Sequence, residues 1–277
     1  MLSWKHYDFL DRREGTNTMI SIVVIEYNAI DEIIQCVKEV KEYCKDVEYE
    51  LIVSSNSCYS SERQAELRKT IPDVKWSFNE KNGGFAYGMN RGLKIAKGDY
   101  LVIMNPDVEV KGSLTVLIDF LNRHKKVGAI GPQIVGRDGA IQDSCRSFVT
   151  PWRFVKRQIR RTMTGAVSVH EGYDYSKTQT VDWVIGAFIM VRREVYEQVG
   201  GLDEAFFMYA EDIDWCTRIW QAGYEVVYCP GLKVVYEGSR SARKNKKYAR
   251  IFLSSHVKYW RKNKWFFGYP KSVRKIY

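Results

Sequence analysis

Three acidic residues, Glu211, Asp212 and Asp214, stand together directly after the aromatic segment FFMY at residues 206–209. The apolar spacing that follows predicts a helix over residues 211–222, so the acids occupy its first turn. Acids are common there because they cap backbone N–H groups and favour the positive end of the helix dipole. Carboxylates beside an apolar wall also bind protons more tightly, which suits a general base. Both interpretations stay open on these residues alone.

Another carboxylate, Asp107, follows the apolar run YLVIM at residues 100–104. Such a run predicts a strand that is buried on both faces. A carboxylate just beyond it can ligate a Mg²⁺ or Mn²⁺ ion that bridges a diphosphate. Because Asn-Pro and Asp also favour turns, a simple turn at residues 105–107 is the alternative.

The segment NGGF at residues 82–85 precedes a predicted helix. Backbone N–H groups at a glycine-rich helix start, such as those near Gly84, can receive a phosphate, and Arg91 can pair with one. The segment matches neither the dinucleotide-binding nor the P-loop fingerprint, and no G-x-S-x-G nucleophile elbow occurs in the chain. We expect the helix to be closed by Gly98 as its C-terminal cap.

The elements that position these residues alternate between strand and helix. Short apolar runs predict strands at residues 19–25, 49–53, 74–78 and 100–104, with helical spacing between them. This rhythm predicts an α/β fold, a doubly wound, mostly parallel but mixed sheet with helices on both faces. Such sheets bind ligands at the carboxyl ends of their strands. The residues that follow three of the strands are polar: Glu26, Tyr27 and Asn28; Ser55 and Asn56; Asn105 and Asp107.

Composition excludes several classes of protein. Of the 277 residues, 45% are hydrophobic and 27% charged, as in a globular protein. No apolar run approaches the roughly 18 residues that span a bilayer. The six cysteines form no C-x-x-C pair and the four histidines no cluster, so we expect neither zinc nor disulfides. The charged N-terminal segment does not resemble a signal peptide, so we expect the protein in the cytoplasm, with the inner face of the cell membrane as an alternative.

The positive charge is concentrated at the C-terminal end. Residues 240–277 hold thirteen Lys or Arg and no Asp or Glu, and aromatic residues lie among them. This basic aromatic tail, predicted to be helical, suits peripheral contact with a membrane. The alternatives are a helix that packs its aromatic rings on the domain, or a nucleic-acid surface, for which no recognised motif is present. Residues 151–161 are also basic and aromatic, and weak periodicity predicts a loop over residues 162–180.

Taken in order, five segments resemble the family 2 glycosyltransferases with a GT-A fold, especially the rhamnosyltransferase-like branch. The resemblance covers roughly residues 19–241. The matching segments are SIVVIEYN (21–28), NEKNGGFAYGMNRGLKIAKGDYLVIMNPD (79–107), GAIGPQI (128–134), DWVIGAFIMVRREVYEQVGGLDEAFFMYAEDIDWCTRIWQAGYEVVYCP (182–230) and VVYEGSRS (234–241).

This resemblance implies an inverting enzyme of cell-surface polysaccharide synthesis. It would move a hexose, with rhamnose as one candidate, from a dTDP- or UDP-sugar to a hydroxyl of a saccharide or lipid-linked acceptor, with Mg²⁺ or Mn²⁺ as cofactor. The implied division is an N-terminal extension (1–18), a transferase domain (19–239) and the tail (240–277). Within the domain, residues 19–107 would bind the nucleotide and residues 108–239 the acceptor.

Roles follow by position. Asp212 would be the general base and Glu211 its neighbour in acceptor binding, while Asp107 would hold the metal ion. The donor-sugar and acceptor site would be shaped by Trp183, Gly186 and Ala187. We expect the nucleotide to lie against Glu26, Tyr27, Asn28, Ser55, Asn56, Gly84, Asn90, Arg91, Asn105 and Asp107.

Three positions depart from the family pattern. Ser55 stands where the family usually has an Asp that contacts the base, and Glu26 stands where Thr is common. We therefore expect Glu26 to take over part of the missing carboxylate's role. Tyr236 stands where a metal-binding His is frequent, and Glu237 is the substitute oxygen ligand that the sequence offers.

Two other functions remain as alternatives. A sugar nucleotidyltransferase shares the sheet architecture, but it would need a glycine-rich, basic loop after the first strand. A non-catalytic carbohydrate- or lipid-binding protein on a decayed transferase fold is favoured by the departures at Ser55 and Tyr236. The sequence indicates no oligomeric state.

Overall fold

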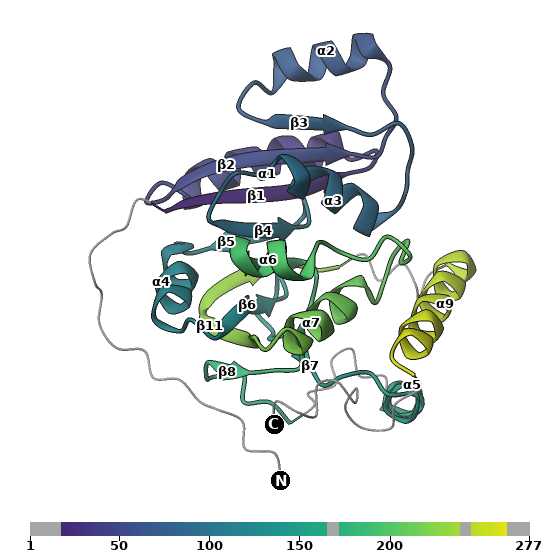
Figure 1. Cartoon of the computed structure of the whole chain (residues 1–277). Coiled ribbons are helices and arrows are strands. Elements are labelled where there is room, and N and C mark those ends of the chain that lie inside the picture. The colour runs from purple at the N-terminus through teal and green to yellow at the C-terminus, as the bar shows by residue number, and fades with distance from the viewer. Residues whose placement is uncertain (1–17, 165–171, 239–244, 265–277) are drawn as a thin grey trace.

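The computed structural model describes residues 18–164, 172–238 and 245–264. Within these residues one sheet has the strand order β3-β2-β1-β4-β10-β6-β11-β5, with β8 beside β11, and β7 and β9 form a separate pair (Figure 1). The strands are β1 Met19–Glu26, β2 Glu48–Ser55, β3 Lys75–Phe78, β4 Tyr100–Met104, β5 Glu109–Lys111, β6 Val127–Val135, β7 Cys145–Arg146, β8 Gln179–Thr180, β9 Trp183–Val184, β10 Phe188–Arg192 and β11 Glu225–Val235.

Strand direction divides the sheet into two parts. Strands β1 to β4 pair in parallel, as the apolar runs predict. Strand β10 then lies antiparallel between β4 and β6, so strands from residues 108–239 continue the sheet that strands from residues 19–107 begin. The predicted α/β fold with a mixed sheet and helices on both faces is confirmed.

Two hydrophobic cores lie on opposite faces of the sheet. In β1, Ile22 and Val24 join the core under α1 and α4, whereas Val23 joins the core under α3 and α7. This alternation explains why a strand buried on both faces is a continuous apolar run. The helices are α1 Ile30–Tyr43, α2 Ser61–Thr70, α3 Phe85–Ile95, α4 Thr115–Arg123, α5 Pro151–Thr164, α6 Arg193–Val199, α7 Glu211–Gln221 and α9 Lys246–Lys262.

Two local expectations are wrong. Helix α3 ends at Ile95 with Ala96 as its cap, and Gly98 has no positive φ. Gly98 instead lies where a Cβ would stand 2.5 Å from the backbone nitrogen of Ser21, so close packing on β1 requires the glycine. The loop predicted from residue 162 begins later, because α5 continues to Thr164. Among the described residues, no helix combines the length and apolarity needed to cross a bilayer.

Helix α9 shows how the first part of the basic tail is placed. The Tyr259 and Trp260 side chains are buried in the core that also contains α7. The Tyr259 hydroxyl lies 2.9 Å from the Thr217 hydroxyl, and Trp260 Nε1 donates to the Val149 carbonyl at 2.7 Å. Over this helix the alternative of packing on the domain therefore holds. The later aromatic residues of the tail, from Trp265 to Tyr277, lie outside the described residues.

We expect Trp260→Ala to lower the free energy of unfolding by about 3–5 kcal/mol, because it removes a buried indole and its hydrogen bond. Leu253→Ala on the same helix is the control: this side chain is exposed, so the loss should be about 0.5 kcal/mol or less. Urea denaturation measures both. Equal, small losses would contradict the packing of α9 on the domain.

Candidate active site

The acids that open α7 follow a strained turn. Tyr209 and Ala210 both have a φ of 69°, and Ala210 is the N-cap of the helix. Left-handed backbone at two successive non-glycine residues is costly, so surrounding contacts must hold it. The Ser255 hydroxyl of α9 donates to the Met208 carbonyl at 2.7 Å. On the other side, the Phe85 N–H of α3 donates to the Phe207 carbonyl at 2.7 Å. The turn is thus fixed from two helices.

The carboxylate of Asp212 is held against the backbone of β9–β10. Its Oδ2 accepts the Gly186 N–H at 3.0 Å, and its Oδ1 accepts the Ile213 N–H at 2.9 Å. A Cβ on residue 186 would stand 3.2 Å from the Cβ of Asp212. Glycine at this position therefore allows the close approach that the hydrogen bond needs.

Glu211, which is buried, and Asp212, which is half-buried, form an acidic pair with unequal proton affinity. Burial, and then the charge of Asp212, raise the pKa of Glu211 well above its usual range. Burial also raises the pKa of Asp212, but the N–H groups of Gly186 and Ile213 and the charge of Arg146 oppose this rise. Glu211 Oε2 is buried without a hydrogen-bond partner. The arrangement favours a proton on Glu211 and an ionised Asp212, which separates an acid from a base.

The carboxyl end of β4 meets the same region. Asn105 donates its backbone N–H to the Ala187 carbonyl and its side-chain Nδ2 to the Tyr236 hydroxyl, both at 3.0 Å. Burial, and then the charge of Asp107, raise the pKa of Tyr236 to about 12, and Asp212 contributes in the same direction. Desolvation is also the main cause that raises the pKa of Asp107, with Glu32 adding to it. Asp107 and Asp212, which lie far apart in the sequence, therefore both raise the pKa of Tyr236.

A buried amide joins the nucleotide edge to the turn before α7. Asn56 Nδ2 donates to the Gly84 carbonyl at 2.9 Å, and its Oδ1 accepts from Asn79 at 2.9 Å. Gly84 has a φ of 91°, and a Cβ on it would stand 2.1 Å from the Phe207 carbonyl oxygen. The glycine-rich loop thus packs directly on the aromatic segment that leads to Asp212.

Glu26 and Ser55, the two positions at the ends of β1 and β2 that depart from the family pattern, are in direct contact. Glu26 and Ser55 are register partners, and the Ser55 hydroxyl donates to Glu26 Oε2. Ser57 Oγ lies 2.9 Å from each Glu26 oxygen, while Oε1 also accepts the Ala29 N–H at 2.9 Å and the Tyr59 hydroxyl at 3.2 Å. Glu26 is fully buried. A carboxylate is thus present at this edge, supplied by β1 and covered by the segment after β2.

The other residues that the sequence predicts to contact the nucleotide differ in their surroundings. Tyr27 is exposed beyond β1, and Asn28, with a φ of 52°, donates its N–H to Ser57 Oγ at 2.7 Å. Arg91 is exposed and lies over the Tyr87 ring, 4.6 Å from its centroid. The side-chain amide of Asn90 instead bonds to the backbone of Leu202. Its Nδ2 donates to the Leu202 carbonyl at 2.8 Å, and its Oδ1 accepts the Leu202 N–H at 2.9 Å. Asn90 therefore ties α3 to the segment before α7, and its contact with a nucleotide stays a prediction.

Trp183 is buried, and its ring lies against Arg146, a residue that the sequence did not single out. Its Nε1 donates to the Ser147 carbonyl at 2.9 Å, and the Arg146 guanidinium lies 5.3 Å from its ring centroid. Arg146 also pairs with Asp143 at 3.6 Å and favours the ionised form of Asp212. Sequence spacing gives no hint of this role, because Arg146 lies 66 positions before Asp212. Ser57, which contacts Glu26, is a second residue that the sequence did not single out. The only sequence signal for it is that it stands two positions after Ser55, the last residue of β2.

The residues present fit a divalent cation that arrives with a diphosphate. No cluster of three or more His, Cys, Asp or Glu suited to a metal ion occurs among the described residues. Glu237 Oε1 accepts the Arg137 N–H at 2.7 Å, so this oxygen is engaged by the neighbouring turn. Mg²⁺ commonly needs only one or two protein carboxylates when substrate phosphates complete its shell. Asp107, exposed after β4, offers one.

Comparison with known proteins agrees with this architecture. The family model described as Glycosyl transferase family 2 matches residues 21–200, and one described as the N-terminal domain of galactosyltransferase matches residues 167–239. The chain belongs to glycosyl transferase family 2. The resemblance to its rhamnosyltransferase-like branch is also confirmed.

The relatives of this chain include proteins with rhamnosyltransferase names. The N-acetylglucosaminyl-diphospho-decaprenol L-rhamnosyltransferase of Mycobacterium tuberculosis is 30% identical over 190 residues, 59% of this chain and 58% of that protein. This chain thus spans little more than half of that relative's length. Rhamnosyltransferase WbbL of Escherichia coli (strain K12) is 27% identical over 235 residues, 79% of this chain and 83% of that protein.

A solved structure shows the fold. The mannosyltransferase PcManGT from Pyrobaculum calidifontis, in complex with GDP-Man and Mn²⁺, has a TM-score of 0.59 at 20% identity. The match covers 93% of this chain and 67% of that one. The GT-A fold of this glycosyltransferase is therefore established by its likeness to a solved one.

We expect the buried acid Glu211 to make stability depend on pH. Its folded-state pKa is raised above the unfolded value of about 4.3. The folded state therefore keeps a proton that the unfolded state loses, and stability falls as pH rises above about 4. Relative to Glu211→Gln, the wild-type free energy of unfolding should fall by up to about 1.4 kcal/mol per pH unit. Urea denaturation from pH 4 to 8 measures this difference, and a constant difference would contradict a neutral Glu211.

Proposed function

We propose that this glycosyltransferase is an inverting enzyme. It transfers a sugar from a nucleoside-diphosphate donor to a hydroxyl of a saccharide or lipid-linked acceptor. The observation that carries the proposal is the carboxylate of Asp212, which Gly186 holds beside an acid that keeps its proton. Asp107 and Asn105 at the end of β4 supply the adjoining edge for the donor.

Asp212 acts as the general base. An acceptor hydroxyl is a weak nucleophile until a carboxylate takes its proton during attack. The N–H groups of Gly186 and Ile213 and the charge of Arg146 favour the ionised form of Asp212 and so oppose the rise in its pKa that burial causes. Glu211, holding its proton, can donate a hydrogen bond to the acceptor. A single displacement uses one base and inverts the anomeric carbon, so no covalent enzyme intermediate is needed.

A divalent metal ion, Mg²⁺ or Mn²⁺, is the cofactor of this proposal, and Asp107 is its protein ligand. When bound, the ion neutralises charge that develops on the departing diphosphate. Arg91, exposed on α3, adds a guanidinium that can pair with a phosphate. The Gly84 N–H donates to Asn82 Oδ1 at 3.0 Å, so this glycine contributes through its close packing on Phe207. The Tyr236 hydroxyl accepts a hydrogen bond from Asn105 and lies in the field of Asp107.

The donor we propose is a dTDP- or UDP-sugar, with rhamnose as the first candidate. Support comes from relatives that are named as rhamnosyltransferases. The mycobacterial relative is named for an acceptor that joins a sugar through a diphosphate to decaprenol. By analogy, we propose that a saccharide linked to a lipid diphosphate is the acceptor, as in cell-surface polysaccharide synthesis.

An assay with a panel of donors tests the proposal. We expect transfer from dTDP-rhamnose or a UDP-hexose to a lipid-diphosphate saccharide, and we expect EDTA to abolish the transfer until Mn²⁺ is restored. NMR coupling constants of the product should show an anomeric configuration opposite to that of the donor. Retained configuration would contradict a single displacement by Asp212. Absence of transfer and of donor hydrolysis with every donor would favour a binding protein on this fold.

A further inference from the structure

Helix α5 presents an apolar stripe to solvent. Trp152, Val155, Ile159 and Met163 recur at helical spacing on one side of the helix. Their exposed fractions are 59%, 45%, 53% and 81%. An exposed stripe of this length over three turns differs from a scatter of single apolar residues, because its side chains form one continuous surface.

The other side of α5 is fixed to the domain. The Phe154 ring packs against Phe252 and Trp260 of α9, with centroids 5.8 and 5.4 Å away. Arg157 donates to Asp143 at 3.2 Å. At the start of the helix, Thr150 accepts the Arg153 N–H at 3.0 Å as an N-cap. The helix therefore cannot rotate to bury its apolar stripe without breaking these contacts.

Cations border the stripe. Arg153, Lys156 and Arg160 are exposed along one edge of it, and the Lys156 ammonium lies 5.3 Å from the Trp152 ring centroid. The whole helix carries five basic and no acidic residues. Apolar residues that include a tryptophan, bordered by basic ones, are the composition of helices that lie flat in the interface of an anionic membrane. Pairing of two such helices from two copies would instead oppose like charges.

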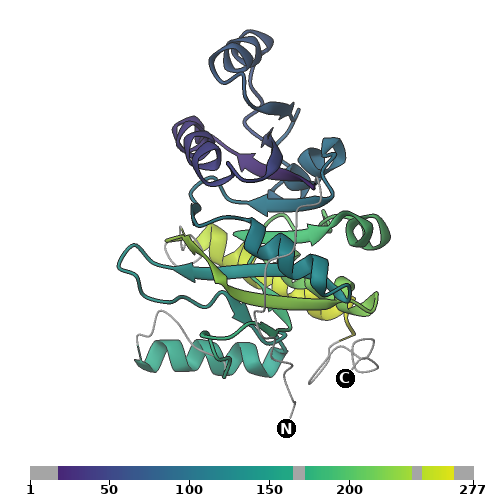
Figure 2. The same ribbon diagram turned by 90° about the vertical axis from the view of Figure 1, so that its left-hand side faces the viewer.

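The position of α5 suits a lipid-borne acceptor. Figures 1 and 2 show the helix along the end of the molecule opposite to α2. A short chain of contacts joins it to the catalytic carboxylate: Arg157 pairs with Asp143, Asp143 with Arg146, and Arg146 favours the ionised Asp212. A membrane under α5 thus lies on the acceptor side of the molecule.

We propose that α5 is a membrane-docking helix that inserts Trp152, Val155, Ile159 and Met163 into the interface of an anionic bilayer. This assignment differs from the one that the sequence suggested, because α9 in the tail buries Tyr259 and Trp260 whereas α5 exposes its apolar side. Docking needs no donor sugar, so its test does not depend on the proposed transfer reaction.

Co-sedimentation of the full chain with vesicles tests the proposal, using phosphatidylcholine with and without phosphatidylglycerol. We expect binding to the anionic vesicles only. The double variants Trp152→Ser/Ile159→Ser and Lys156→Glu/Arg160→Glu should each bind about tenfold more weakly or worse, since each basic residue and each buried apolar group adds to the affinity.

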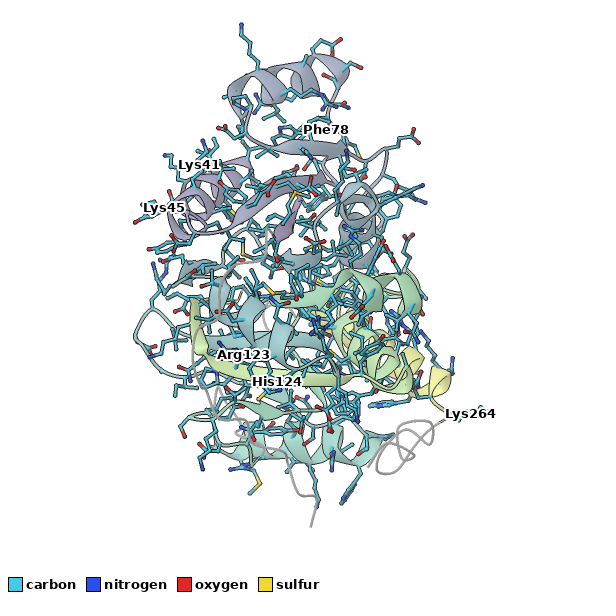
Figure 3. All side chains as sticks on the ribbon, turned by 60° about the vertical axis from the view of Figure 1, so that its left-hand side comes forward. Lys41, Lys45, Phe78, Arg123, His124 and Lys264 are labelled. Atoms are coloured by element: carbon cyan, nitrogen blue, oxygen red, sulfur yellow. The ribbon has the colours of Figure 1, made fainter. Side chains whose placement is uncertain are left out.

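Two control variants make the same kinds of change at exposed residues outside α5. Ile95→Ser/Ile141→Ser removes the same kind of exposed apolar surface, and Lys45→Glu/Lys94→Glu reverses two exposed charges. Lys45 is well separated from α5 in Figure 3. Both controls should bind like the wild type, and all variants should keep its thermal unfolding midpoint.

Three results would overturn the proposal. The first is a wild-type protein that does not bind anionic vesicles, and the second is unchanged binding by the α5 variants. The third is a dimer, seen by light scattering, that Trp152→Ser/Ile159→Ser converts to a monomer, which would assign the stripe to a second copy of this chain.

Discussion

The hydrogen bond from the Gly186 backbone to Asp212 brings together parts of the chain that are distant in sequence. It exists because residue 186 has no side chain and because Tyr209 and Ala210 adopt left-handed backbone before α7. That turn is held in turn by α3 and α9 through the carbonyls of Phe207 and Met208. The glycine-rich loop before α3, helix α9 and Asp212 are therefore mechanically connected, and the position of the Asp212 carboxylate depends on the other two.

Unequal burial and hydrogen bonding give Glu211 and Asp212 different proton affinities. Glu211 lies in apolar surroundings with an oxygen that no hydrogen bond serves, whereas Asp212 receives two N–H groups and lies in the field of Arg146. The same logic applies at the other end of the site. There Glu26 is buried, yet several hydroxyl and amide donors surround it. A carboxyl group thus lies at the end of β1 where the family pattern has one at the end of β2, and Ser55 donates to it. Contact of this carboxyl group with a nucleotide stays a prediction.

Much of the fold could be predicted from the sequence, because a strand buried on both faces must be a continuous apolar run. The places of Asp107 and Asp212 could be predicted for the same reason, since one follows β4 and the other lies in the first turn of α7. Their roles stay predictions. Contacts between distant segments could not be predicted. The spacing of Arg146 says nothing of Trp183 or Asp212, and Gly98 resembled a helix cap although it serves the packing on β1. Helices α9 and α5 are both basic and aromatic, and only the structure shows that α9 buries Tyr259 and Trp260 whereas α5 exposes its apolar stripe.

The role of Asp212 as general base is the central claim of this account. Its most direct test is Asp212→Asn, with the single-turnover transfer rate and the donor dissociation constant measured on the same preparation. We expect the rate to fall by about 10²–10⁴-fold, the contribution of a general base, while the dissociation constant for the donor changes little. A rate within a few-fold of the wild type, with donor binding intact, would contradict the account.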